Sequence, residues 1–77
     1  MTIRDLMEQG IEIQGAYKIQ TWDDEASNFP KLLEEGEDFR YNTHNEKLLD
    51  MEIKYIYATQ KNGTIDAYTV FEVGEED

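Results

Sequence analysis

The spacing of apolar residues predicts a short helix at the start of the chain. Apolar side chains recur there at the interval of one helical face, at Ile3, Leu6 and Met7. Thr2 and Asp5 have the spacing of a capping box, in which each side chain bonds the backbone of the other residue. Gly10 suits the left-handed conformation that ends a helix. Two turns of helix are unstable alone in water, so we expect the apolar face to pack on a sheet.

After this helix, the apolar residues change to a period of two. The residues that share one side are Ile11, Ile13, Tyr17 and Ile19. This alternation is typical of a half-buried strand. Gly15 falls on the apolar side and has no side chain, which indicates a bulge or a close approach of the helix backbone. Trp22 then leads into a polar, acidic run over residues 23–28, which predicts a turn.

The middle of the chain predicts an edge strand and a loop. Residues 29–33 favour a strand, and Pro30 restricts it to an edge or to the strand's first residues because proline donates no ladder hydrogen bond. Residues 34–38 are almost all acidic and predict a loop. Phe39 and Tyr41 follow as aromatic anchors on either side of an arginine.

A second capping box predicts a helical turn over residues 44–49. Thr43 and Glu46 have the required spacing, and the apolar pair Leu48 and Leu49 would fix the turn on the core.

The last third of the chain predicts a β-hairpin. Two alternating runs, residues 51–58 and 65–73, flank a break at Lys61, Asn62 and Gly63. A three-residue loop at the break keeps one face nearly all apolar, because it pairs Ile53 with Phe71, Tyr55 with Thr69 and Tyr57 with Ala67. We therefore expect four aromatic side chains in the core, namely Tyr17, Tyr55, Tyr57 and Phe71. A partly exposed apolar group is left on the other face: Ile56, Tyr68 and Val70.

These elements predict a single domain over residues 1–77 of the α+β class. We expect an antiparallel sheet of three or four strands, with a short N-terminal helix packed on one face and a second short helical turn. Residues 74–77 are expected to be a frayed acidic tail.

Charge and composition narrow the range of partners. Eighteen acidic residues against seven basic ones give a net charge of -11, which repels nucleic-acid phosphates and anionic lipids. We therefore expect neither direct nucleic-acid binding nor membrane binding. The chain has no cysteine, which excludes disulfides, thiolate metal sites and thiol nucleophiles. The first residues lack the apolar stretch of a signal peptide, so a cytoplasmic location is expected.

No catalytic, cofactor or metal site can be assembled from the sequence. Asp23, Asp24 and Glu25 lack the alternating ligands and central glycine of a calcium loop, so a solvated turn is expected there. His44 is the single histidine and Ser27 the single serine, which leaves little for a catalytic triad. His44 is interpreted as an exposed residue at a helix start, and we predict that the protein is not an enzyme.

Aromatic residues beside acids are the candidates for binding a protein. Aromatic side chains supply interface anchors, and acids favour a basic partner surface. The candidate residues are Trp22, Asp23, Asp24, Glu37, Asp38, Phe39, Tyr41 and Tyr68. Four of these are aromatic and have no core-facing place in the predicted fold: Trp22, Phe39, Tyr41 and Tyr68.

Two stretches resemble short uncharacterised proteins of phages and mobile elements of Gram-positive bacteria. They are residues 1–22, MTIRDLMEQGIEIQGAYKIQTW, and residues 49–57, LDMEIKYIY, which together cover less than half of the chain. No activity is established for those proteins, so the resemblance transfers no catalytic or binding residue. It implies an accessory gene of a mobile element, a setting in which small acidic proteins of the anti-CRISPR or antirestriction type block host nucleic-acid enzymes.

Two functions follow from these observations. The leading hypothesis is a non-enzymatic module that binds a basic protein surface, as an inhibitor that occludes a nucleic-acid-binding groove. The alternative is a structural or regulatory protein that forms homo-oligomers through an edge strand or through the exposed apolar group on the hairpin.

Overall fold

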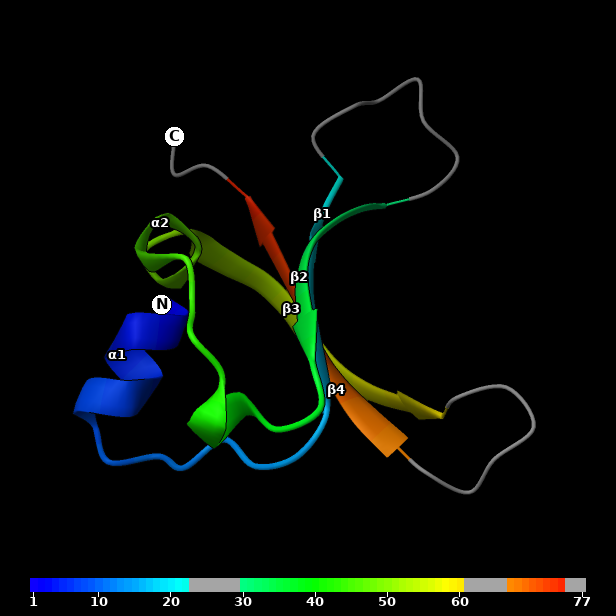
Figure 1. The fold of residues 1–77 in the computed structure, drawn as a ribbon. Helices are drawn as coiled ribbons and strands as arrows, with labels where there is room; N and C mark the ends of the chain where they lie inside the picture. The colour runs from blue at the N-terminus through cyan, green and yellow to red at the C-terminus, as the bar shows by residue number, and fades with distance from the viewer. Residues whose placement is uncertain (23–29, 61–66, 75–77) are drawn as a thin grey trace.

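The computed structural model describes residues 1–22, 30–60 and 67–74. Its four strands form one sheet in the order β2-β1-β4-β3, and three short helices lie on one side of it (Figure 1). The elements in chain order are α1 (Ile3–Glu8), β1 (Tyr17–Thr21), β2 (Lys31–Gly36), the 3-10 helix η1 (Phe39–Tyr41), α2 (Glu46–Leu49), β3 (Glu52–Gln60) and β4 (Ala67–Gly74). The α+β class is therefore confirmed.

The sheet is mixed, and the prediction of an antiparallel sheet is wrong in this respect. β1 pairs antiparallel with β2, and β3 pairs antiparallel with β4, but β1 and β4 run parallel to each other. A parallel pair needs a long connection, and the chain between β1 and β4 contains β2, both later helices and β3. The two most buried strands, β1 and β4, occupy the centre, with Ile19 and Phe71 side by side and almost fully buried.

Helix α1 begins as its sequence predicts. The Thr2 hydroxyl accepts a hydrogen bond from the Asp5 backbone at 3.1 Å, and the Asp5 carboxylate accepts one from the Thr2 backbone at 2.9 Å. Ile3 and Leu6 are buried, whereas Met7 is 45% exposed, so the prediction that Met7 shares the packed face is wrong. Gly10 has a φ of 81°, in the left-handed region that follows the helix.

The strand predicted to start at Ile11 starts at Tyr17 instead. Ile11 is 48% exposed, and residues 11–16 form an irregular connection. Gly15 lies in this connection with a φ of 83°, so it turns the chain and is not a strand bulge. Its carbonyl accepts a 2.9 Å hydrogen bond from the Phe39 backbone, which anchors η1.

Strand β2 lies at an edge of the sheet directly after Pro30, as predicted. The strand runs further than expected, because its pairing with β1 continues to Gly36 opposite Tyr17. Residues 34–36 are thus part of the strand, and their assignment to a loop is wrong.

Helix α2 has a different cap from the predicted one. The Asn45 side chain accepts a hydrogen bond from the Lys47 backbone at 3.1 Å, so Asn45 is the N-cap and Thr43 is not. Leu48 and Leu49 are buried, as expected. Arg4 of α1 binds the carboxylates of Glu46 and Asp50, each at 2.5 Å, and so joins the two helices.

The hairpin of β3 and β4 forms in a different register. Tyr57 pairs with Val70 and Gln60 with Ala67, where the three-residue loop requires Tyr57 opposite Ala67. A register irregularity lies between Ile53 and Tyr55, so the alternation of faces changes phase there. The loop residues Lys61, Asn62 and Gly63 lie outside the described residues, as do the 23–28 turn and the acidic tail beyond Gly74.

The core lies between the helices and one face of the sheet. Its buried members are Ile3, Leu6, Tyr17, Ile19, Phe39, Leu48, Leu49, Phe71 and Val73. The predictions for Tyr17 and Phe71 are confirmed. Tyr55 and Tyr57 are 67% and 41% exposed, so their predicted core positions are wrong, and so is the exposed position predicted for Val70, which is 2% exposed. Phe39 is 3% exposed and packs edge-on against Tyr17, although it was expected to have no core position.

Candidate functional site

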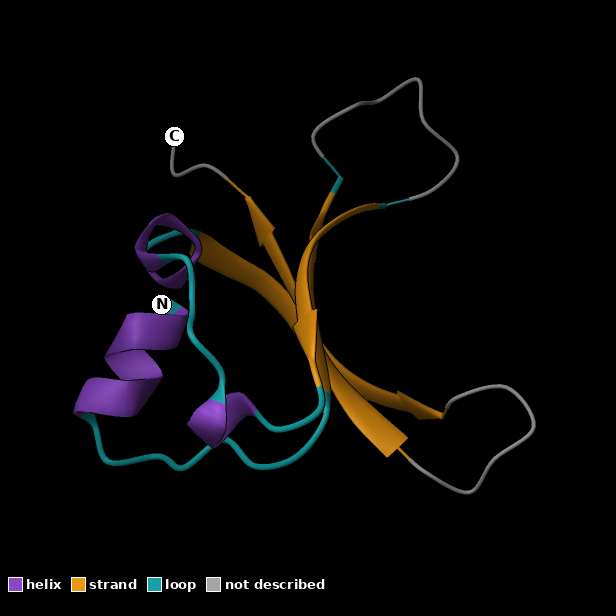
Figure 2. Ribbon diagram, viewed as in Figure 1, coloured by secondary structure: helices purple, strands orange, loops and turns teal. Residues whose placement is uncertain are grey.

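The side of the sheet opposite the helices is the candidate site, and we call it the uncovered face. Phe71 and Val73 point into the core, so the alternation along β4 turns Val70 and Glu72 to the opposite side. None of the described helices lies on that side (Figure 2). Strand pairing and alternation place these residues there: Lys18, Gln20, Trp22, Leu32, Glu35, Tyr55, Tyr57, Tyr68, Val70 and Glu72.

A carboxylate sits among aromatic groups on this face. Glu72 on the central strand β4 is only 9% exposed. The indole Nε1 of Trp22 donates a hydrogen bond to Glu72 Oε1. Burial and, next, a hydrogen bond to Glu72 raise the pKa of Tyr57, whose hydroxyl also accepts a 3.0 Å hydrogen bond from Gln20. Glu72 is therefore held by neutral donors.

Large parts of the aromatic rings on this face are open to solvent. Trp22 is 50% exposed, Tyr55 is more exposed than Trp22, and Tyr57 is somewhat less exposed. Lys18 places its ammonium 4.7 Å from the centre of the Tyr68 ring, in a cation–π contact. Exposed aromatic rings grouped on a rigid sheet are typical of an interaction surface.

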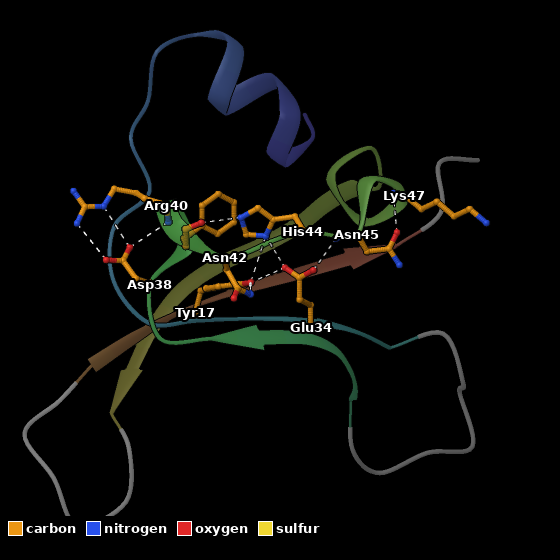
Figure 3. Close-up of polar contacts among 9 residues, drawn as sticks. Tyr17, Glu34, Asp38, Arg40, Asn42, His44, Asn45 and Lys47 are labelled. Atoms are coloured by element: carbon orange, nitrogen blue, oxygen red, sulfur yellow. Dashed lines mark hydrogen bonds and ion pairs between the residues drawn. The ribbon is translucent and has the colours of Figure 1, made fainter.

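A second polar cluster lies on the helix side of the sheet (Figure 3). The Tyr17 hydroxyl donates to the Glu34 carboxylate at 2.7 Å and accepts from the Asn42 amide at 2.7 Å. His44 Nδ1 lies 2.7 Å from the same Glu34 oxygen, and its Nε2 lies 2.8 Å from the Phe39 carbonyl oxygen. Each His44 ring nitrogen therefore lies within hydrogen-bond distance of an oxygen, and these two contacts hold the ring between Glu34 and the Phe39 carbonyl.

This cluster corrects the interpretation of His44 as an exposed residue. Its side chain is 11% exposed and that of Glu34 is 12% exposed. Burial, and then the hydrogen bond to Glu34, raise the pKa of Tyr17 to about 12. Burial of Glu34 acts in the opposite sense, but hydrogen bonds from His44, Tyr17 and the Asn45 backbone lower the pKa of Glu34 overall. Each group is committed to an internal partner, so the cluster joins β1, β2 and the segment before α2.

A pocket of about 350 Å³ opens beside this cluster, between the end of α1 and η1. Its lining is mainly apolar, with Met7, Ile11, Ile13 and Phe39 among the lining residues. The polar groups at its border are already paired: Arg40 binds Asp38, Glu12 accepts from Gln14, and His44 binds Glu34. The pocket therefore offers no unpaired polar group among these residues to orient a ligand.

The predicted protein-binding residues fall into separate regions. Trp22 and Tyr68 lie on the uncovered face, whereas Glu37 lies between β2 and η1, and Tyr41 ends η1 and is 80% exposed. Asp38 caps η1 and pairs with Arg40, whose hydrogen bond lowers the pKa of Asp38. Phe39 is part of the core. Asp23 and Asp24 lie outside the described residues.

Of the ten residues placed on the uncovered face, only Trp22 and Tyr68 were predicted site residues, and the missed ones include Tyr55, Tyr57 and Glu72. A signal for Glu72 was present, because it is an acid inside the apolar run of the last strand. Tyr55 and Tyr57 were assigned to the core, since the sequence does not reveal the change of phase in β3.

Within the described ranges, no three histidine or carboxylate side chains come together as a group that could hold a metal ion. The longest helix there, α1, has six residues, and none is a candidate to cross a membrane.

The fold and the uncovered face define a small α+β domain, in which helices cover one side of the sheet and the other side is open to solvent. Comparisons with protein-family models, curated proteins and solved structures give no match.

Proposed function

We propose that the protein is a non-enzymatic binding module that docks its uncovered sheet face on a basic protein surface. The observation that carries this proposal is the group of exposed aromatic rings around the Glu72 carboxylate, on a chain with a net charge of -11. Aromatic anchors on a rigid sheet supply contact area at low entropic cost, and the negative charge speeds the encounter with a basic partner.

The resemblance to proteins of mobile elements supports a narrower form of this proposal. In that form the partner is a host nucleic-acid-binding protein, and the acidic domain occludes its basic groove.

The test compares two exposed tyrosines on different parts of the molecule. Wild-type protein, Tyr55→Ser and Tyr41→Ser are used as baits in parallel at low and moderate salt, and a captured partner is then purified and measured by calorimetry. Tyr55 lies on the uncovered face and Tyr41 on η1, and both are well exposed, so neither change disturbs the core. We expect Tyr55→Ser to weaken binding about tenfold or more, while Tyr41→Ser binds like wild type.

Salt supplies a second criterion. Binding should weaken as the ionic strength rises, because screening reduces the attraction between the acidic domain and a basic surface. A partner that is insensitive to both Tyr55→Ser and salt would contradict the proposal.

A second candidate function, self-association, is favoured by strand β3. This strand forms the other edge of the sheet and exposes Tyr55, Ile56 and Tyr57. Exposed apolar edge strands are templates for pairing with another copy. Sedimentation velocity over a range of concentrations tests it, and a monomer throughout that range would exclude it.

A further inference from the structure

The position of Glu72 suggests what the uncovered face recognises. A carboxylate that is almost buried is normally paired with a cation, because removing the charge from water is costly. The described residues place no arginine, lysine or histidine nitrogen within ion-pair distance of Glu72. Its partners are neutral, namely the Trp22 indole and the Tyr57 hydroxyl. Glu72 thus has no countercharge from these parts of the chain.

The two donors also become better receptors for a cation. A ring that donates a hydrogen bond to a carboxylate gains electron density, and the face of an aromatic ring attracts cations. The rings of Trp22 and Tyr57 are about half exposed, so a side chain of another molecule can reach them.

The face already binds one cationic group of its own. The Lys18 ammonium lies over the Tyr68 ring, on the same side of the sheet as Glu72. This contact shows that an ammonium group and an aromatic ring meet on this surface. The net charge of -11 makes a cationic partner the complementary one.

We infer that the uncovered face receives an arginine side chain of the partner, which stacks on the exposed rings of Trp22 and Tyr57 above the Glu72 carboxylate. The inference rests on the proposed function, since it names the chemistry of that docking. Arginine fits better than lysine because its planar guanidinium stacks on aromatic rings and is less strongly hydrated.

The probe for the test is N-acetyl-arginine amide, and its comparison is the citrulline analogue, which has nearly the same shape and no charge. Trp22 is the single tryptophan of the chain, so the indole N–H signal in an NMR titration reports on this site alone. We expect a saturable shift of that signal with the arginine probe, and binding weaker by about tenfold or more with citrulline.

Two variants that each remove one carboxylate charge test whether the arginine probe binds at Glu72. Glu72→Gln keeps an oxygen that accepts from Trp22, and we expect it to weaken arginine binding by about threefold to tenfold. Glu37→Gln removes the same charge from an exposed position between β2 and η1, and we expect wild-type binding. Equal binding of arginine and citrulline would overturn the inference, as would equal weakening by both variants. The comparison of the two probes uses wild-type protein, so it remains decisive if Glu72→Gln does not fold.

The inference and the proposed function fail in different ways. If a protein partner depends on Tyr55 but the arginine and citrulline probes bind equally, the arginine inference is wrong and the proposed docking on the uncovered face stands. If the arginine probe binds selectively but no captured partner is sensitive to Tyr55→Ser, the proposed function is wrong.

Discussion

The hydroxyl of Tyr17 on β1 donates a 2.7 Å hydrogen bond to the carboxylate of Glu34 on β2. The same carboxylate binds His44 and the Asn45 backbone, so one largely buried acid connects the edge of the sheet to the segment that leads into α2. Edge strands have a neighbour on one side only, and this connection gives β2 a second attachment.

Replacing Glu34 should reduce the stability of the protein, and it should also make that stability depend less on pH. Glu34→Gln removes the charge that accepts hydrogen bonds from Tyr17 and His44, and we expect the free energy of unfolding to fall by about 1 to 3 kcal/mol at neutral pH. Because folding lowers the pKa of Glu34, its contribution is complete above its ordinary value of 4.5 and is lost as the pH falls through the lower, folded value. Urea denaturation between pH 7 and about pH 3 measures both effects.

The control for this change is Glu35→Gln, on the adjacent, exposed position of β2. It should retain the wild-type loss of stability below the ordinary pKa of Glu34, whereas Glu34→Gln should show a weaker loss. Parallel pH profiles for the two variants would show that the polar cluster around Glu34 does not hold β2 as described.

Glycine is required at position 36 because of the same cluster. A Cβ there would lie 2.8 Å from Cε1 of Tyr17 and 2.9 Å from the Asn42 amide nitrogen. We expect Gly36→Ala to cost about 1 to 3 kcal/mol, since the packed Tyr17 ring must move. Gly74→Ala is the matched control, because its Cβ would meet only the flexible side chain of Lys54, whose Cε would lie at 3.0 Å. Thermal unfolding compares them, and equal losses would contradict the crowding at Gly36.

Phe71 and Ile56 are opposite each other in the hairpin, yet they should differ greatly in importance. Phe71 is 1% exposed in the core, while Ile56 is 50% exposed on the edge strand. Phe71→Ala should cost about 3 to 5 kcal/mol and Ile56→Ala about 1 kcal/mol, measured by chemical denaturation. A larger loss for Ile56→Ala than for Phe71→Ala would contradict the burial of Phe71 and the exposure of Ile56.

The capping box of α1 should be measurable by substitution at Thr2. Thr2→Ala removes the oxygen that accepts from the Asp5 backbone, and we expect a loss of about 1 kcal/mol in unfolding free energy. Thr2→Ser keeps that oxygen and should remain close to wild type. If serine and alanine destabilise the protein equally, the hydroxyl is not the group that matters.

The sequence by itself determined the features that depend on neighbours along the chain. The cap of α1 joins residues three apart, and the left-handed Gly10 and the start of β2 directly after Pro30 also depend on local geometry. These features follow from backbone sterics and short-range hydrogen bonds, which are the same in any fold.

Only the tertiary structure decided which residues form the uncovered face and the polar cluster around Glu34. Trp22 meets Glu72 fifty positions further along the chain, and Tyr17 meets His44 twenty-seven positions further along. The irregularity between Ile53 and Tyr55 shifts the alternation by one residue, which moves Tyr55 and Tyr57 from the expected core to the open side. A period of two shows that a strand has two faces, but the choice of face depends on packing against strands and helices distant in sequence.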